Sequence, residues 1–389
     1  MPQPSAPRRA DIDWIRVAAF GLLIVYHVGL VYAPWDWHVH SPHTIEPLRY
    51  AALVTNPWRL TLLFLVSGVA LRFMSRRLTA GAVLKARFAR LAPPFLFGVL
   101  VLVPPQAWIE AMDKGSFNQG LLAWWLGEFS PQGFANGVPL NHLWFVLYIA
   151  VYSLAAGALL AAPRLLAALE SGLAWLLKGW RLFLLPMAYL AFARDKLFLT
   201  YGLSNHLTTD WYNHAMSFGV FGLGFLLALN EGVWKTFERL RWPFLATAAA
   251  ALPYMLWLEG QSGGLAAGGL LKDSVYAIDQ WATIGAVLGF ASRHIRHADG
   301  PLLRYLTDAV FPCYLAHQTL LVIFAYTLEP YAMPAEVEAP LLVMLTLGGS
   351  LAVYEVVRRV DWLRPLWGLK PRVRKAAAVA AEPARVEAA

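Results

Sequence analysis

Long apolar runs recur along the whole chain of 389 residues, and short polar segments separate them. A helix needs about 20 apolar residues to cross a bilayer, so runs of this length predict transmembrane helices. We predict ten, at about 13–33, 56–74, 91–111, 142–161, 182–198, 212–230, 243–260, 273–291, 305–327 and 339–357. The fifth is the weakest, because Arg194, Asp195 and Lys196 interrupt it. The pattern therefore predicts an all-α integral membrane protein, a bundle of about ten transmembrane helices.

The polar segments between these runs differ in charge. Alternate segments, beginning with the N-terminus, hold basic clusters such as SRRLTAGAVLKARFAR and the tail RRVDWLRPLWGLKPRVRK. The other segments hold only Arg49, Lys114 and Lys272. Basic residues concentrate in cytoplasmic loops, so both termini are expected in the cytoplasm. We divide the chain into a cytoplasmic segment (1–12), a membrane domain (13–360) and a basic cytoplasmic tail (361–389) with a disordered end.

Composition agrees with a membrane protein and argues against a soluble one. Hydrophobic residues make up 58% of the chain and charged residues only 14%, against about 25% charged in soluble domains. Many of the 17 tryptophans lie near predicted span ends, where interfacial aromatic belts form. The net charge of +8 is explained by loops facing anionic lipid, so no nucleic-acid partner is expected. The single Cys313 excludes a disulfide within the chain.

The first predicted span carries an arginine and a histidine on one stripe. Arg16 and His27 are eleven residues apart, which in a helix is three turns plus about 20° and roughly 16 Å along the axis. Asp13, one turn earlier, is placed to orient Arg16. The stripe thus presents a cation near the cytoplasmic face and a titratable base in the outer half. The alternative is a snorkelling Arg16 and a structural, hydrogen-bonded His27.

Two further segments carry polar groups that need a partner. Arg87 and Arg90 end a basic loop just before Pro93 and Pro94, which are expected to open the third span. Such a cluster can bind phosphates, although cytoplasmic loop charge alone also explains it. Arg59 lies inside the second span and needs an acidic partner, an anionic substrate or a water-filled cavity. In the same span, Ser67 and Gly68 are small enough to allow close helix contact.

Histidines occur mostly in the outer half of the predicted topology. His142 is expected at the outer surface and His317 near the middle of the ninth span, and each is more often structural than catalytic. His38 and His40 suggest a metal site, but no acidic or cysteine ligands complete a set, so we expect no bound metal. The exposed aromatic residues Trp35, Trp37, Trp211 and Tyr212 suit either an interfacial belt or stacking on sugar rings.

Taken in order, these motifs resemble those of acyltransferase family 3, a family of membrane acyltransferases. The motifs are Asp-x-x-Arg-x10-His at Asp13, Arg16 and His27, Ser-Gly at 67–68, the arginine-rich loop ending in Pro93 and Pro94, and Tyr-Leu-x-His at 314–317. The resemblance covers about 13–360. The segments YHVGLVYAPWDWHVHS, PWRLTLLFLVSG and NHLWFVLYI resemble the branch that succinylates osmoregulated periplasmic glucans. Many family members that acetylate O-antigen or peptidoglycan carry a Glu after the His-Leu-Trp motif. In this sequence no carboxylate follows that motif at 142–144.

The resemblance implies an acyl-CoA-dependent O-acyltransferase in the bacterial inner membrane. Acyl-CoA, with succinyl-CoA the expected form, would be a co-substrate on the cytoplasmic side, no permanent cofactor is expected, and a glucan or another envelope polysaccharide would accept the acyl group outside. On this reading Arg16, Arg87 and Arg90, with Asp13, hold the CoA phosphates. His27 is the general base, since a neutral imidazole has a pKa near 6.5. Ser67 and His317 orient groups or stabilise the oxyanion, while Arg59, His142 and Trp37 contact the acyl group or the acceptor.

Two alternatives stay open on the sequence alone. One is an O-acetyltransferase that acts on another envelope polysaccharide or on a lipid-linked sugar, which would differ in its outer loops. The other is a proton-coupled transporter in which His27, Arg59 and His317 form a relay. A transporter more often shows intramembrane carboxylates and a paired-repeat hydropathy pattern, and neither is clear here.

Overall fold

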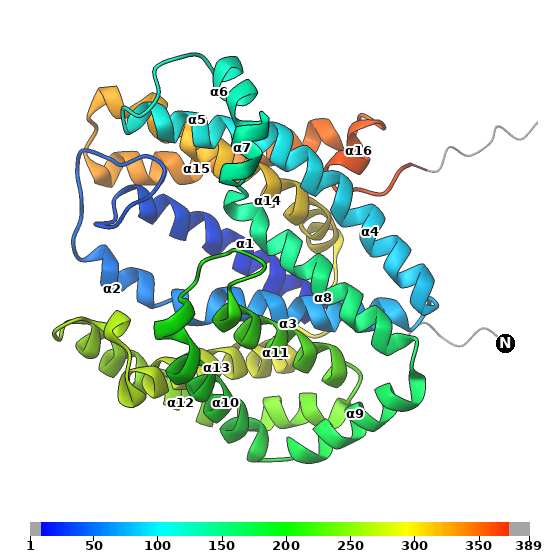
Figure 1. Cartoon of the computed structure of the whole chain (residues 1–389). Helices are drawn as coiled ribbons and strands as arrows, with labels where there is room; N and C mark the ends of the chain where they lie inside the picture. The colour runs from blue at the N-terminus through cyan, green and yellow to red at the C-terminus, as the bar shows by residue number, and fades with distance from the viewer. Residues whose placement is uncertain (1–8, 373–389) are drawn as a thin grey trace, which may run out of the picture.

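The computed structural model describes residues 9–372, and every regular element in this range is helical (Figure 1). A helix covers each of the ten predicted segments, and shorter helices connect them. The long helices are α1 (Ala10–Val31), α3 (Asn56–Ser75), α4 (Ala80–Phe97), which continues through a π-helical turn (Gly98–Leu102) into α5 (Val103–Asp113), α8 (Trp144–Leu160), α10 (Arg181–Tyr201), α11 (Trp211–Leu227), α12 (Glu231–Glu259), α13 (Leu270–His294), α14 (Pro301–Leu328) and α15 (Ala335–Val357). The short helices are α2 (Leu48–Leu53), α6 (Leu121–Glu128), α7 (Pro131–Asn136), α9 (Pro163–Leu176) and α16 (Leu363–Leu366). The all-α prediction is confirmed, while the N-terminal residues 1–8 and the predicted disordered end of the tail lie outside the described residues.

Length and composition support a multi-pass membrane protein with fewer unambiguous spans than ten. Six helical stretches in the described chain are long and apolar enough to cross a bilayer, and a seventh is reached if α11 and α12, bent by 115° at their junction, form one span. Helices α10 and α13 do not meet this test. They carry the buried ion pair of Arg194 and Asp273, whose Nε and Oδ1 atoms are 2.9 Å apart. The fifth predicted span is nevertheless a continuous helix.

Two hydrophobic cores meet at the first helix. One core joins α3, α8 and α10–α13, and the other joins α1, α5, α14 and α15. In Figure 1 the second group occupies the upper part of the bundle and the first the lower part, with α1 and α8 between them. Helix α1 packs on both α14 and α3. The stripe that carries Arg16 and His27 therefore lies at the junction of the two groups.

The predicted close helix contact at Gly68 is confirmed between α3 and α11. A Cβ atom on Gly68 would lie 2.0 Å from the carbonyl oxygen of Phe221, and one on Gly224 would lie 2.1 Å from the carbonyl oxygen of Leu65. Both distances are far below any real contact, so the two backbones touch at reciprocal glycines. This contact fixes the position of Ser67, the residue before Gly68.

The sequence suggested that the basic segment before the third span is a loop. In the structure this segment forms most of α4. Thr79 caps this helix, because its side-chain oxygen accepts a hydrogen bond from the backbone N–H of Ala82. Ala, Leu, Lys and Arg are strong helix formers, and their propensity outweighs the charge of the segment. Pro93 and Pro94 lie inside the helix rather than at its start. As a result Arg87 and Arg90 are one turn apart on a single helical face.

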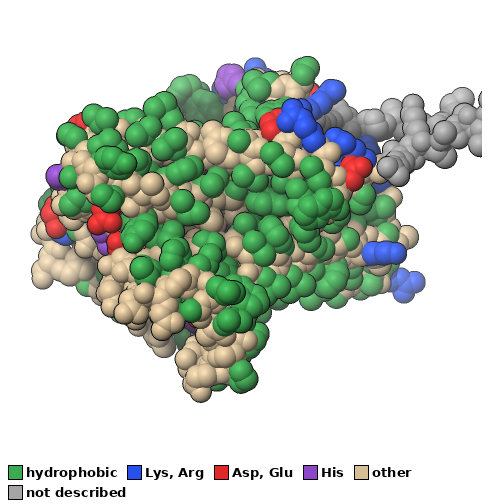
Figure 2. Space-filling view, turned by 90° about the horizontal axis from the view of Figure 1, so that it is seen from above, with side chains coloured by type: hydrophobic (Ala, Val, Ile, Leu, Met, Phe, Trp, Pro, Cys, Tyr) green, Lys and Arg blue, Asp and Glu red, His purple; other side chains and the backbone are tan. Residues whose placement is uncertain are grey.

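Charged side chains are unevenly distributed over the molecular surface. Figure 2 shows most of the visible Lys and Arg side chains on the right of the view, with two acidic groups among them, and most of the other visible Asp and Glu side chains on the left. This distribution is the one expected for a basic cytoplasmic face. The orientation of the termini stays a prediction.

Candidate active site

A cavity of about 630 Å³ lies at the junction of the two helix groups. Its lining comes from α1, α3, α4, α8, α11, α13 and α14 and from segments that connect helices. Seven of the ten residues singled out from the sequence line it: Arg16, His27, Arg59, Ser67, Arg87, Arg90 and His142. One continuous cavity is therefore lined by both ends of the α1 stripe and by residues of six other helices.

Hydrogen bonds determine which nitrogen of His27 is free to act as a base. The Nδ1 of His317 lies against the backbone carbonyl oxygen of Tyr314 and must donate to it. The Nε2 of His317 therefore carries a lone pair, and it lies 3.3 Å from the Nδ1 of His27, which must donate in turn. The Nε2 of His27 is left with its lone pair, and it has no hydrogen-bond partner among residues 9–372. This chain of contacts fixes the tautomer and the orientation of the His27 imidazole.

The sequence placed His142 at the outer surface, but the structure buries it beside His317. Its side chain is 7% exposed, and its ring centroid lies 5.2 Å from that of His317. The Nε2 atom donates to the carbonyl oxygen of Leu315 at 3.3 Å, and the buried Nδ1 has no partner within the described chain. His142 lies in the 3₁₀ turn Asn141–Leu143, and both His142 and the apolar Leu143 are buried in this turn. Nδ1 is thus an acceptor without a donor.

Three arginines line the part of the cavity reached from α4 and the start of α1. Arg87 interacts electrostatically with Arg90 and Arg16, so the three cations are neighbours. The Nε of Arg87 donates to the Ser153 hydroxyl at 3.2 Å, while its buried Nη2 has no partner within residues 9–372. Arg16 pairs with Asp13 at 3.7 Å, as the spacing predicted. A cluster of three cations with a buried, unpartnered N–H is suited to a polyanion.

Arg59 is a buried cation without an anionic partner in the described chain. Its side chain is 2% exposed, and its guanidinium carbon lies 3.7 Å from the centre of the Tyr26 ring. Nη1 donates to the Thr55 hydroxyl at 3.3 Å, and Nε is buried with no partner among residues 9–372. The same Tyr26 ring lies 5.8 Å from the ring of His27. Arg59 and His27 are therefore separated by one side chain.

The remaining predicted residues take different positions around the cavity. Ser67 lines it from α3, whereas Trp37 lies outside its lining and stacks on His27 at 6.5 Å between ring centroids. Trp35 and Trp211 are exposed as expected. Tyr212 is buried instead, because its hydroxyl accepts a hydrogen bond from Arg194 at 3.3 Å.

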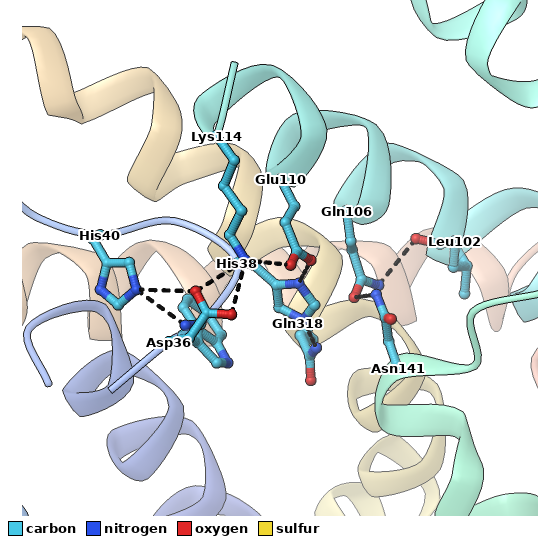
Figure 3. A network of polar contacts seen from close by, with 10 residues as sticks. Asp36, His38, His40, Leu102, Gln106, Glu110, Lys114, Asn141 and Gln318 are labelled. Carbon is cyan, nitrogen blue, oxygen red and sulfur yellow. Dashed lines mark hydrogen bonds and ion pairs between the residues drawn. The ribbon is translucent and has the colours of Figure 1, made fainter. Parts of the chain in front are cut away.

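Sequence reasoning missed a set of polar groups on α5, α14 and the loop after α1, shown in Figure 3. His38 contacts Glu110 through Nδ1 and Gln318 through Nε2, and both His38 and Gln318 line the cavity. Only the histidine-rich composition of the loop hinted at this. Within residues 9–372 no three His, Cys, Asp or Glu side chains are arranged so that they could hold a metal ion.

The comparisons with known proteins agree with this site. The family model described as an acyltransferase domain matches residues 9–355, so the chain belongs to acyltransferase family 3 and is an enzyme of the acyltransferase class. Over its full length it is similar to glucans biosynthesis protein C of Salmonella paratyphi B, Salmonella agona and Salmonella enteritidis. Each is 22% identical over 387 residues, which cover 95% of this chain and 97% of the relative. No solved structure matches the chain.

Proposed function

We propose that the protein transfers an acyl group from cytoplasmic acyl-CoA to a hydroxyl of a periplasmic glucan, across the bacterial inner membrane. The observation that carries this proposal is the hydrogen-bonded chain from Tyr314 through His317 to His27, which leaves the His27 Nε2 lone pair free beside the cavity. Membership of the acyltransferase family supports the reaction class. The name of the glucans biosynthesis relatives supports the acceptor.

In this reaction the oxygen of the sugar hydroxyl attacks the carbonyl carbon of the thioester, and His27 Nε2 takes the proton of that hydroxyl. The tetrahedral intermediate then collapses, the carbon–sulfur bond breaks, and the CoA thiolate takes the proton from His27. His317 holds the His27 ring in place and stabilises the imidazolium through the same hydrogen bond. Ser67 and the unpartnered Nδ1 of His142 are the groups we assign to binding around the reacting carbon.

The cation cluster of α1 and α4 suits the phosphates of CoA. Arg16, Arg87 and Arg90 line the same cavity as His27, and Arg16 and His27 are roughly 16 Å apart along the helix axis. The pantetheine arm of CoA is long and thin enough to bridge such a distance. The thioester would then reach His27 while the nucleotide stays at the cytoplasmic face.

Arg59 supports an acyl group that carries a second carboxylate, and succinyl is the group we expect. A buried guanidinium whose Nε–H has no partner in the described chain is costly unless an anion or water binds it. The distal carboxylate of a succinyl thioester provides such an anion, and an acetyl group does not. Arg59 and His27 both contact the ring of Tyr26 and both line the cavity, an arrangement that suits a short, four-carbon acyl chain.

Replacing Arg59 with Gln is expected to lower succinyl transfer by roughly 10–100-fold in kcat/KM, because a charge-assisted hydrogen bond is lost. Acetyl transfer, measured with acetyl-CoA, should be unchanged or improved. The matched control is Arg49→Gln, since Arg49 stacks on Tyr50 outside the cavity. An equal loss for both donors would remove Arg59 from acyl-group recognition.

The proposed function is tested by deleting the gene in its host and measuring the masses of the periplasmic glucans. We expect the deletion to remove a succinyl-sized mass and the wild-type gene to restore it. Unchanged glucans would contradict the acceptor, and a new acyl loss on lipopolysaccharide or another envelope polymer would identify the acceptor instead. A loss of acetyl-sized mass would contradict the succinyl assignment alone. Unchanged acylation of every envelope polymer would favour the proton-coupled transporter.

A further inference from the structure

The mechanism above does not use the chain of hydrogen bonds formed by Glu110, His38 and Gln318. Glu110 lies on α5, His38 on the loop after α1, and Gln318 on α14, so three separate segments converge here (Figure 3). The side chains of His38 and Glu110 are 15% and 30% exposed, and Gln318 is 4% exposed. Lys114 binds the other oxygen of Glu110 at 2.8 Å. A carboxylate, an imidazole and an amide are thus aligned toward the cavity.

The contacts require one protonation pattern. The carboxylate of Glu110 only accepts, so the Nδ1 of His38 carries the proton and donates it. The Nε2 of the neutral ring is then an acceptor, and the amide nitrogen of Gln318, 2.8 Å away, must be its donor. This fixes the orientation of the Gln318 amide independently of any other contact. Its carbonyl oxygen and its second N–H are not used by His38.

The position of Gln318 relates it to the base. Gln318 follows His317, the residue that orients His27, and it lines the cavity together with His27 and His38. The three arginines that suit CoA include Arg16, near the opposite end of α1 from the loop that carries His38. The aromatic ring of Trp37 lies 5.1 Å from the ring of His38 and stacks on His27.

We propose that Gln318 binds the acceptor sugar, its amide oxygen accepting a hydrogen bond from one hydroxyl and its free N–H donating to a neighbouring sugar oxygen. His38 and Glu110 are positioning residues that hold this amide. The electron density passed from the carboxylate through His38 makes the amide oxygen a better acceptor, which favours a hydroxyl over an anionic group. This inference rests on the proposed function and adds the acceptor subsite to it.

The test uses the purified full-length protein with succinyl-CoA and unsubstituted glucan isolated from the deletion strain. We expect Gln318→Leu to raise the KM for glucan by about tenfold, since one or two hydrogen bonds are lost, while the KM for succinyl-CoA stays unchanged. Glu110→Gln should raise the same KM by a smaller factor. The control is His43→Gln, because His43 lies exposed on the same loop as His38 and does not line the cavity, and it should leave both KM values unchanged.

The outcomes separate this inference from the proposed function. A wild-type protein that transfers neither a succinyl group from succinyl-CoA nor an acetyl group from acetyl-CoA to the glucan contradicts the proposed function, and the acceptor subsite falls with it. An active wild type whose glucan KM is unaffected by Gln318→Leu and Glu110→Gln contradicts the subsite alone. A purely structural role would lower the thermal unfolding midpoint or change both KM values together. If Gln318→Leu does not fold, Glu110→Gln decides, because Glu110 does not line the cavity.

Discussion

A His27→Gln variant is expected to transfer acyl groups with a kcat lower by about 10²–10⁴-fold, the usual contribution of a general base. Glutamine is similar in size and can still donate a hydrogen bond to His317, but it cannot take a proton from a sugar hydroxyl. Because His27 is about 16 Å from the arginine that we assign to CoA, the KM for acyl-CoA should change little. Initial rates of the purified variant at several acyl-CoA concentrations measure both quantities.

The matched control for this variant is His43→Gln. His43 is exposed on the loop that follows α1 and does not line the cavity. Its replacement should leave kcat and KM at the wild-type values. Wild-type kcat in the His27 variant would show that the base lies elsewhere, and the unpartnered Nδ1 of His142 would become the first alternative.

Replacing Arg194 with Met is expected to destabilise the protein by about 3–5 kcal/mol, because it leaves the buried carboxylate of Asp273 without its cation. Arg194 is 4% exposed and Asp273 is 1% exposed. The guanidinium also lies 3.9 Å from the ring centres of both Phe198 and Tyr276, so its contacts are aromatic as well as ionic. The thermal unfolding midpoint in one detergent should fall clearly.

Lys196→Met provides the control, since the side chain of Lys196 is 61% exposed and pairs only with Asp195 on the same helix. This change should move the midpoint little. Adding Asp273→Asn to the Arg194 variant should recover part of the loss, because it removes the unpaired charge. Equal midpoints for Arg194→Met and Lys196→Met would mean that the buried pair does not hold α10 on α13.

Much of the fold and of the site follows from patterns local to one helix. Apolar run length located all ten long helical segments, and the eleven-residue spacing placed Arg16 and His27 on one side of α1, where both line the cavity. The small residues of the second span likewise predicted the contact at Gly68. Such features depend on helical periodicity alone, which a sequence displays directly.

Features that depend on contacts between distant segments could not be predicted. Arg194 interrupts an apolar run, and only the fold brings Asp273 to it from another helix. The burial of His142 depends on how its turn packs against α14. The role of His38 needs Glu110 and Gln318, which are 72 and 280 residues away in the chain. The charge of the segment containing Arg87 also suggested a loop, although its helix propensity proved stronger.

In the proposed function, one cavity joins a CoA site on one side of the membrane to a hydroxyl acceptor on the other. The most direct measurement reconstitutes the protein in sealed vesicles, with succinyl-CoA on the side of the arginine cluster and unsubstituted glucan on the opposite side. Vesicles in which the protein has the reverse orientation serve as the control. We predict succinylated glucan only when donor and acceptor are on these opposite sides. Product formed only when both substrates share one side would contradict transfer across the membrane.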